Sequence, residues 1–175
     1  MKEPTIEQLD KIRKEGYRPG VVACILHKRK LLMFYKEAHK LWQLPQGGIN
    51  NKETYIDALK RGLTEELGET FVKKLGFKKV SIIDFDKMEF KPGRHKVKPL
   101  QDDDGKEITM QGKYYFFCIV KAKTDKLYIE ETQFDQHFWV TFREAYFLTS
   151  RMYQQGKKRI TTKVLNKLNE LGLIE

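Results

Sequence analysis

Two adjacent carboxylates, Glu65 and Glu66, stand near the end of a segment with helical periodicity. Adjacent carboxylates repel each other, and near the C-terminal end of a helix they also lie close to its negative pole. A divalent cation such as Mg²⁺, which prefers carboxylate oxygens, would offset both effects. In the alternative interpretation, the glutamates form a solvated face paired with Lys60 or Arg61. The pair alone leaves metal binding and a surface ion pair both open.

The glutamate pair belongs to a longer pattern of glycine, acidic and basic residues. Five residues separate Gly47 from Glu53, seven separate Glu53 from Arg61, and Arg61 is followed by Leu63, the glutamate pair and Gly68. This stretch resembles the Nudix box, the loop–helix–loop of hydrolases that cleave nucleoside diphosphates linked to another group. The box reads glycine, five residues, glutamate, seven residues, then Arg-Glu-aliphatic-any-Glu-Glu-any-Gly. Seven of its eight invariant or aliphatic positions up to Gly68 are met without insertion.

Flanking residues are similar to one branch of that family, the bacterial RNA pyrophosphohydrolases and the asymmetric diadenosine tetraphosphate hydrolases. The resemblance rests on Gly-Tyr-Arg-Pro at 16–19, Trp-Gln-Leu-Pro-Gln-Gly-Gly-Ile at 42–49, Phe-Asp at 134–135 and Trp-Val at 139–140. It spans about residues 16 to 172. It implies a Nudix fold of the α/β (α+β) class, in which a mixed β-sheet is sandwiched between helices as α/β/α.

The same resemblance implies a catalytic and metal-binding set. Glu65 and Glu66 would hold Mg²⁺, or Mn²⁺ in its place, against pyrophosphate oxygens, where the metal neutralises charge and generates a hydroxide. Glu53 and Arg61 would pair to brace the loop against the helix. Gly47 would let the main chain come close to metal and phosphate, because it lacks a Cβ.

A substrate-binding set is implied as well, consisting of Arg18, Lys36, Gln46, Lys113 and Tyr114. Lys36 stands where the branch commonly has arginine, so it keeps the charge but loses the bidentate fork. Arg18 could equally be a surface arginine and Lys36 an edge-strand lysine. Tyr114, like Phe138 and Tyr153, could stack on bases or could simply be a packing residue.

Two positions depart from the family pattern. Gly62 replaces the glutamate that follows the box arginine, and glycine can neither bind metal nor accept a proton. Gln133 stands where the branch usually has another glutamate, and glutamine cannot ionise. Three accounts follow: a hydrolase of attenuated activity, a catalytically silent Nudix domain that binds nucleotides or RNA, or a replacement introduced to trap substrate.

Periodicity and turn signals predict one domain over residues 1–175, with a lead-in helix at 1–15, the Nudix box at 47–69 and a C-terminal helix at 158–175. The box helix should begin at Thr54, which has capping-box spacing to Asp57, and end at Gly68. A further helix is expected at 142–152, and the apolar face of the last helix at 160–171. Strands are expected at 21–26, 31–35, 78–90, 108–121 and 138–140. The polar segment from Phe90 to Glu107 reads as a loop that could be a lid, an RNA contact or a solvated insertion.

The net charge of the chain bears on the kind of partner it could bind. The 175 residues carry a formal charge of +10, which favours a polyanion such as RNA but also suits a plain solubility surface. No apolar run approaches the length of a membrane span, and the first residues are too polar for a secretory signal, so we expect a cytoplasmic protein. Cys24 and Cys118 lie in apolar strands and are expected to be reduced core residues. No DNA-specific motif is present, and the sequence does not address oligomeric state.

These observations predict an Mg²⁺-dependent Nudix hydrolase that cleaves a pyrophosphate bond in 5′-triphosphorylated RNA or in a dinucleoside polyphosphate. Because Gly62 removes a carboxylate from the box, we expect slower turnover than the motif suggests. The basic last segment and the branch resemblance favour RNA or a dinucleoside polyphosphate over a small sugar nucleotide.

Overall fold

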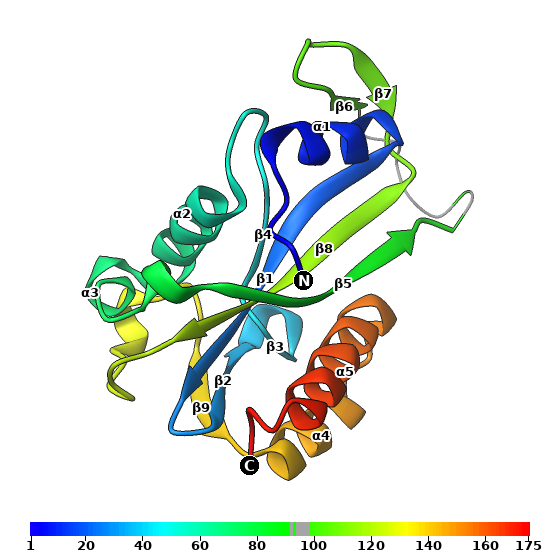
Figure 1. The fold of residues 1–175 in the computed structure, drawn as a ribbon. Coiled ribbons are helices and arrows are strands. Elements are labelled where there is room, and N and C mark those ends of the chain that lie inside the picture. Colours follow the sequence, from blue (N-terminus) through cyan, green and yellow to red (C-terminus); the bar gives the residue numbers. More distant parts are fainter. Residues whose placement is uncertain (92, 94–98) are drawn as a thin grey trace.

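A long strand, β1 (Tyr17–His27), lies at the centre of a mixed seven-stranded sheet (Figure 1). It pairs in parallel with β8 (Gly112–Lys121) and antiparallel with β2 (Lys30–Lys36) and β4 (Gln46–Gly48). The main path runs β3–β2–β1–β8–β5, with β3 at Leu41–Gln43, β5 at Ser81–Glu89, and β9 at Gln136–Val140 pairing with β2. The computed structural model describes residues 1–91, 93 and 99–175.

Helices cover both faces of this sheet (Figure 1). Alternate residues of β1 point to opposite sides: Val21, Ala23 and Ile25 join one apolar core, and Val22, Cys24 and Leu26 join the other. The first core packs against α1 (Ile6–Lys14), α2 (Tyr55–Leu67) and α3 (Glu69–Val72), and the second against α4 (Phe142–Ser150) and α5 (Gln155–Glu170). The predicted α/β/α class is confirmed. Short 3₁₀ turns lie at Glu37–His39, Phe77–Lys79 and Ile129–Glu131.

The box helix α2 begins and ends where the sequence predicts. Thr54 caps it by accepting a hydrogen bond from the Asp57 N–H at 3.1 Å, and Gly68 ends it with a φ of +81°, which favours glycine. The capping box itself is altered. Asp57 is one methylene shorter than glutamate, and its carboxylate accepts from the Thr54 hydroxyl at 2.7 Å instead of the Thr54 main-chain N–H.

Other expected elements have different boundaries. The lead-in helix occupies Ile6–Lys14 with a full capping box at Thr5. The last helix starts at Gln155, before the expected residue 158, and ends at Glu170. Its first turn has no side-chain cap and contains lysines instead of the acidic residues that usually mark the start of a helix. The sequence therefore gives little indication of where this helix begins. The expected strand at 108–121 divides into β7 (Glu107–Thr109) and β8.

Part of the segment expected to be a polar loop is a hairpin. β6 (Pro99–Gln101) pairs antiparallel with β7, and the turn between them is closed by the Asp102 carboxylate, which accepts from the N–H groups of Asp104 and Lys106. Residues 92 and 94–98 of that segment lie outside the described residues. The alternation of polar and apolar residues in these three-residue strands is too short to reveal them.

This hairpin and helix α1 both form hydrogen bonds with the loop at residues 49–52, which leads into α2. The Arg13 guanidinium is almost fully buried, with 2% of its side chain exposed, and donates to the main-chain oxygens of Ile49 at 3.1 Å and Asn50 at 2.8 Å. Its charge is balanced by Asp103 of the hairpin, 3.3 Å away. The same Asp103 oxygen accepts from the Lys52 N–H at 3.2 Å, so hairpin and helix hold one loop from both ends.

Among the described residues, no helix is long and apolar enough to cross a membrane. Cys24 and Cys118 are buried and free, as predicted.

Replacing Arg13 by methionine should lower the free energy of unfolding by about 3 kcal/mol, because it leaves a carboxylate and two carbonyls without their buried donor. Urea denaturation measures this. Lys11→Met is the matched control, since Lys11 is an exposed lysine of the same helix. Equal losses in the two variants would contradict the role given to Arg13.

Candidate active site

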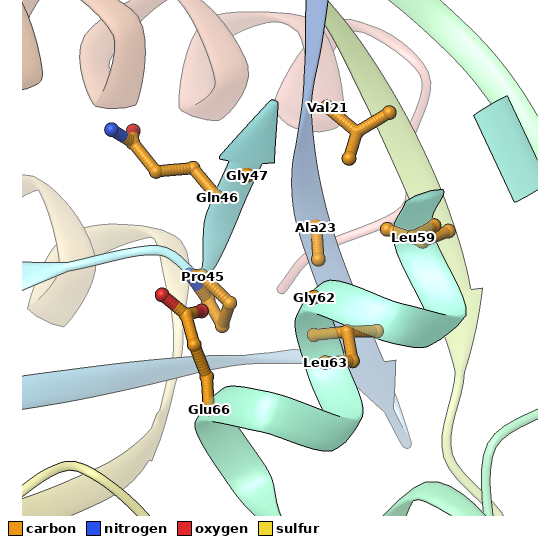
Figure 2. Close-up of a pocket in the computed structure, with 9 residues that line it drawn as sticks. All are labelled: Val21, Ala23, Pro45, Gln46, Gly47, Leu59, Gly62, Leu63 and Glu66. Atoms are coloured by element: carbon orange, nitrogen blue, oxygen red, sulfur yellow. The ribbon is translucent and has the colours of Figure 1, made fainter. Parts of the chain in front are cut away.

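The predicted metal ligands lie where α2 faces β1 and the strand β4. Register pairing of Val21 with Gly47 holds β4 against β1, so that α2 packs over both. A narrow pocket opens between them (Figure 2). Its lining comes from β1, from the Pro45–Gly47 segment and from α2: Val21, Ala23, Pro45, Gln46, Gly47, Leu59, Gly62, Leu63 and Glu66.

Gly62 faces open space in this pocket. A Cβ built on Gly62 would have no heavy atom within 4 Å outside its own helix backbone and chain neighbours. Packing therefore does not require glycine, although glycine within a helix costs about 1 kcal/mol relative to alanine. A Cβ is thus sterically tolerated at this position, one helical turn before Glu66.

Glu66 points its carboxylate toward Pro45 and the start of β4 (Figure 2). Burial raises the pKa of Glu66 to about 7, and the Gln46 main-chain N–H and the cation of Lys157 act in the opposite direction. The main-chain oxygen of Glu66 accepts from the Gln133 N–H at 2.8 Å. The two altered positions, Gly62 and Gln133, thus both lie beside Glu66.

Glu53 and Arg61 make the brace that the sequence predicts. The guanidinium of Arg61 donates to both carboxylate oxygens of Glu53, at 2.8 and 2.9 Å, and to the Gly48 main-chain oxygen at 2.9 Å. These bonds hold the pKa of Glu53 below its ordinary value and raise that of Arg61. Glu65 is exposed and lies 3.6 Å from a third Arg61 nitrogen.

A second pocket adjoins the first across Gln46 and Gly47. Arg18 and Lys113, from the paired strands β1 and β8, line it together with Gly48. A Cβ on Gly48 would lie 2.6 Å from an Arg18 guanidinium nitrogen, so the Arg18 side chain would have to move. Burial, and then the charge of Arg18, lowers the pKa of Lys113. The positive charges of Arg18 and Lys113 repel each other. A bound anion would relieve this repulsion, so the pocket is suited to an anionic ligand.

Two predicted substrate contacts lie away from these pockets. Lys36 donates through its ammonium to the main-chain oxygen of Gln133 and lines neither pocket. Tyr114 projects from β8 to the face opposite Lys113, where its ring stacks on Phe85 and tilts against Phe116, each with 5.0 Å between centroids. Arg18, Gln46 and Lys113 are brought together, whereas Lys36 and Tyr114 are not.

Lys157 also belongs to this site, although it lies outside the sequence motifs that predicted the other residues. It extends from α5, donates to the side-chain oxygen of Gln43, and its pKa is lowered by burial and raised by Glu66. The sequence signal was only its place in a basic run. Other members of that run are engaged elsewhere, since Arg159 and Lys163 contact the buried Asp86 and Lys158 donates to the Ser150 main-chain oxygen.

The oxygen atoms near the first pocket decide whether a divalent cation could bind there. Among the described residues, no group of three or more His, Cys, Asp or Glu side chains is gathered as a metal site. Glu66 lines the pocket together with Gly47, and Glu65 is the preceding residue of α2, exposed and close to Arg61. Mg²⁺ is commonly held by one or two carboxylates together with substrate phosphates. The donor set therefore fits Mg²⁺ that is completed by a phosphate ligand.

Comparison with known proteins agrees with this geometry. The NUDIX domain family matches residues 16–164, and the chain belongs to that family. An RNA pyrophosphohydrolase of Sulfurovum sp. (strain NBC37-1) is 31% identical over 170 residues, covering 92% of this chain and 98% of that protein. An RNA pyrophosphohydrolase of Campylobacter jejuni subsp. doylei is 27% identical over 168 residues, covering 92% and 98%. These matches support a Nudix hydrolase with pyrophosphohydrolase relatives.

Solved structures share the fold. A possible asymmetric diadenosine tetraphosphate hydrolase from Jonesia denitrificans superposes with a TM-score of 0.59 at 16% identity, covering 87% of this chain and 95% of that one. The E. coli dihydroneopterin triphosphate pyrophosphohydrolase gives 0.56 at 14% identity, covering 85% and 97%. At these identities the likeness concerns the fold alone.

The Glu53–Arg61 brace predicts a pH-dependent stability difference. Because the pKa of Glu53 is lowered in the folded state, its contribution is present above the unfolded pKa of about 4.3 and is lost as the pH falls through the folded value. Glu53→Gln should lower the free energy of unfolding by about 1 kcal/mol at pH 7, and the difference should shrink below about pH 4. Denaturation at several pH values measures this, with Glu69→Gln as control, since Glu69 is exposed. A difference that grows toward low pH would contradict the brace.

Proposed function

We propose that this protein hydrolyses a pyrophosphate bond in 5′-triphosphorylated RNA or in a dinucleoside polyphosphate, in the cytoplasm and with Mg²⁺ or Mn²⁺. The observation that carries the proposal is the junction of two pockets: the one holding Glu66 adjoins the one lined by Arg18 and Lys113. A chain of phosphates placed across Gln46 and Gly47 would meet cations at one end and carboxylates at the other. The names of the relatives agree with such a substrate.

In this proposal each residue has a limited task. Arg18 and Lys113 neutralise the phosphate chain and orient it, and Lys157 supplies a further positive charge beside Glu66. Glu65 and Glu66 would hold the metal, and Arg61 with Glu53 keeps the loop in register. When bound, the metal neutralises phosphate charge and lowers the pKa of a coordinated water. Lys36 and Tyr114 stay proposals as substrate contacts, since neither lines the two pockets.

Activity is proposed to be attenuated, because Gly62 leaves the metal with one carboxylate fewer than the family pattern. The second candidate, a silent domain that binds nucleotides or RNA, is favoured by the same residue and by Gln133. The two candidates differ in turnover. The protein should release product from 5′-triphosphorylated RNA or diadenosine tetraphosphate in Mg²⁺ or Mn²⁺, and Glu65→Gln/Glu66→Gln should not. Binding without turnover above that double variant would establish the silent domain.

Restoring the missing acid should raise activity. Gly62→Glu is expected to increase kcat at least about tenfold, because a Cβ at position 62 meets no neighbouring atom and a third carboxylate strengthens metal binding. Gly62→Gln is the matched control, since it has similar size and helix propensity but no charge. Steady-state kinetics with Mg²⁺ compares the three. If the glutamine variant gained as much as the glutamate variant, the carboxylate would not be the limiting group.

The cationic pocket predicts an effect on substrate binding. Lys113→Ala should raise KM for a triphosphorylated substrate about tenfold or more, since it removes a half-buried charge from the phosphate site. Lys121→Ala changes an exposed lysine on the same strand, β8, and should leave KM nearly unchanged. Equal KM values for the Lys113 variant and the wild type would remove this pocket from the proposed site.

A further inference from the structure

An exposed aromatic groove lies between β9 and α4, on the helical layer opposite α2. Its walls include Phe138 and Phe147, whose side chains are 54% and 56% exposed, with Arg143 between them. The groove has a volume of about 520 Å³, within the range of about 300–1,000 Å³ typical of ligand pockets. More than half of the surface of each residue remains in solvent. Exposed aromatic side chains gathered at one place are characteristic of a binding surface.

The charged side chains at the groove are two arginines and one glutamate. Arg143 lines it, and the guanidinium carbon of Arg151 lies 4.4 Å from the centroid of the Phe147 ring. Glu144 is the one acid among the lining residues, and it stays ionised, because hydrogen bonds from the N–H and hydroxyl of Thr141, at 2.8 and 3.1 Å, lower its pKa. The balance of these charges is positive. Aromatic faces flanked by arginines suit bases joined by phosphates.

A chain of neighbouring residues links the groove to the candidate active site. Phe138 stacks on Trp42, with 5.2 Å between centroids and 18° between planes. The next residue in β3, Gln43, accepts a hydrogen bond from Lys157, the cation beside Glu66.

We propose that this groove holds the single-stranded body of an RNA substrate downstream of its 5′ end, with bases stacked on Phe138 and Phe147 and phosphates near Arg143. The proposal rests on the proposed function for its substrate class. It makes a long RNA a better substrate than a dinucleotide or a dinucleoside polyphosphate, because only the long RNA reaches the groove.

Kinetic measurements with a long and a short substrate test this proposal. Phe138→Ala/Phe147→Ala should raise KM about twenty-five-fold or more for a 5′-triphosphorylated, unstructured RNA of about twelve nucleotides, because each of the two lost stacking contacts weakens binding about fivefold or more. KM for a 5′-triphosphorylated dinucleotide should not change. Both rings are solvent-exposed, so the variant is expected to fold. Tyr146→Ala is the matched control, since Tyr146 is 52% exposed on the same helix but does not line the groove.

Binding measurements separate the groove from the catalytic proposal. Fluorescence anisotropy with a 5′-hydroxyl RNA of the same length needs no turnover, and it should show weaker binding for the double variant and a salt dependence reduced by Arg143→Ala. This result would support the groove even if no substrate were cleaved. Unchanged RNA affinity and unchanged KM would overturn it. So would an aromatic-dependent dimer in sedimentation equilibrium, or an acidic peptide that binds the groove while RNA does not.

Discussion

The candidate site depends on keeping one short stretch of main chain, from Gly47 to Glu53, in a fixed conformation. Its carbonyl oxygens are held from two directions: Arg61 binds that of Gly48 from inside the box, and Arg13 binds those of Ile49 and Asn50 from outside it. Each guanidinium has its own carboxylate, Glu53 or Asp103. Charged donors paired in this way are strong and directional, so the loop can present Gln46 and Gly47 to a ligand without rearranging.

This arrangement explains why the loss of a carboxylate at Gly62 does not imply loss of the site. The brace, the cationic pocket and the half-buried Glu66 are all assembled, and no compensating side chain fills the space at Gly62. Arg18, Lys113 and Lys157 keep positive charge where a phosphate chain would lie.

Local signals in the sequence predicted the parts of the structure that depend on neighbouring residues. Thr54 and Gly68 delimit α2, because helix caps are encoded locally. The Glu53–Arg61 ion pair was expected from the resemblance to the Nudix box. Contacts between distant segments were not predictable in this way. The Arg13–Asp103 pair joins residues 90 positions apart, and Lys157 reaches the site only because α5 packs across the sheet. Tyr114 was selected for its residue type, but the alternation of β8 places it on the other face from Lys113.

The central claim is that an intact Nudix site lacks one metal-binding carboxylate, and metal binding tests it without requiring turnover. Electron paramagnetic resonance of Mn²⁺ titrated into the wild type, Gly62→Glu and Glu65→Gln/Glu66→Gln, each with a non-hydrolysable triphosphate, compares their affinities directly. The account predicts measurable binding by the wild type, binding about tenfold or more tighter by Gly62→Glu, and none by the double variant. Equal Mn²⁺ affinities in all three proteins would contradict it.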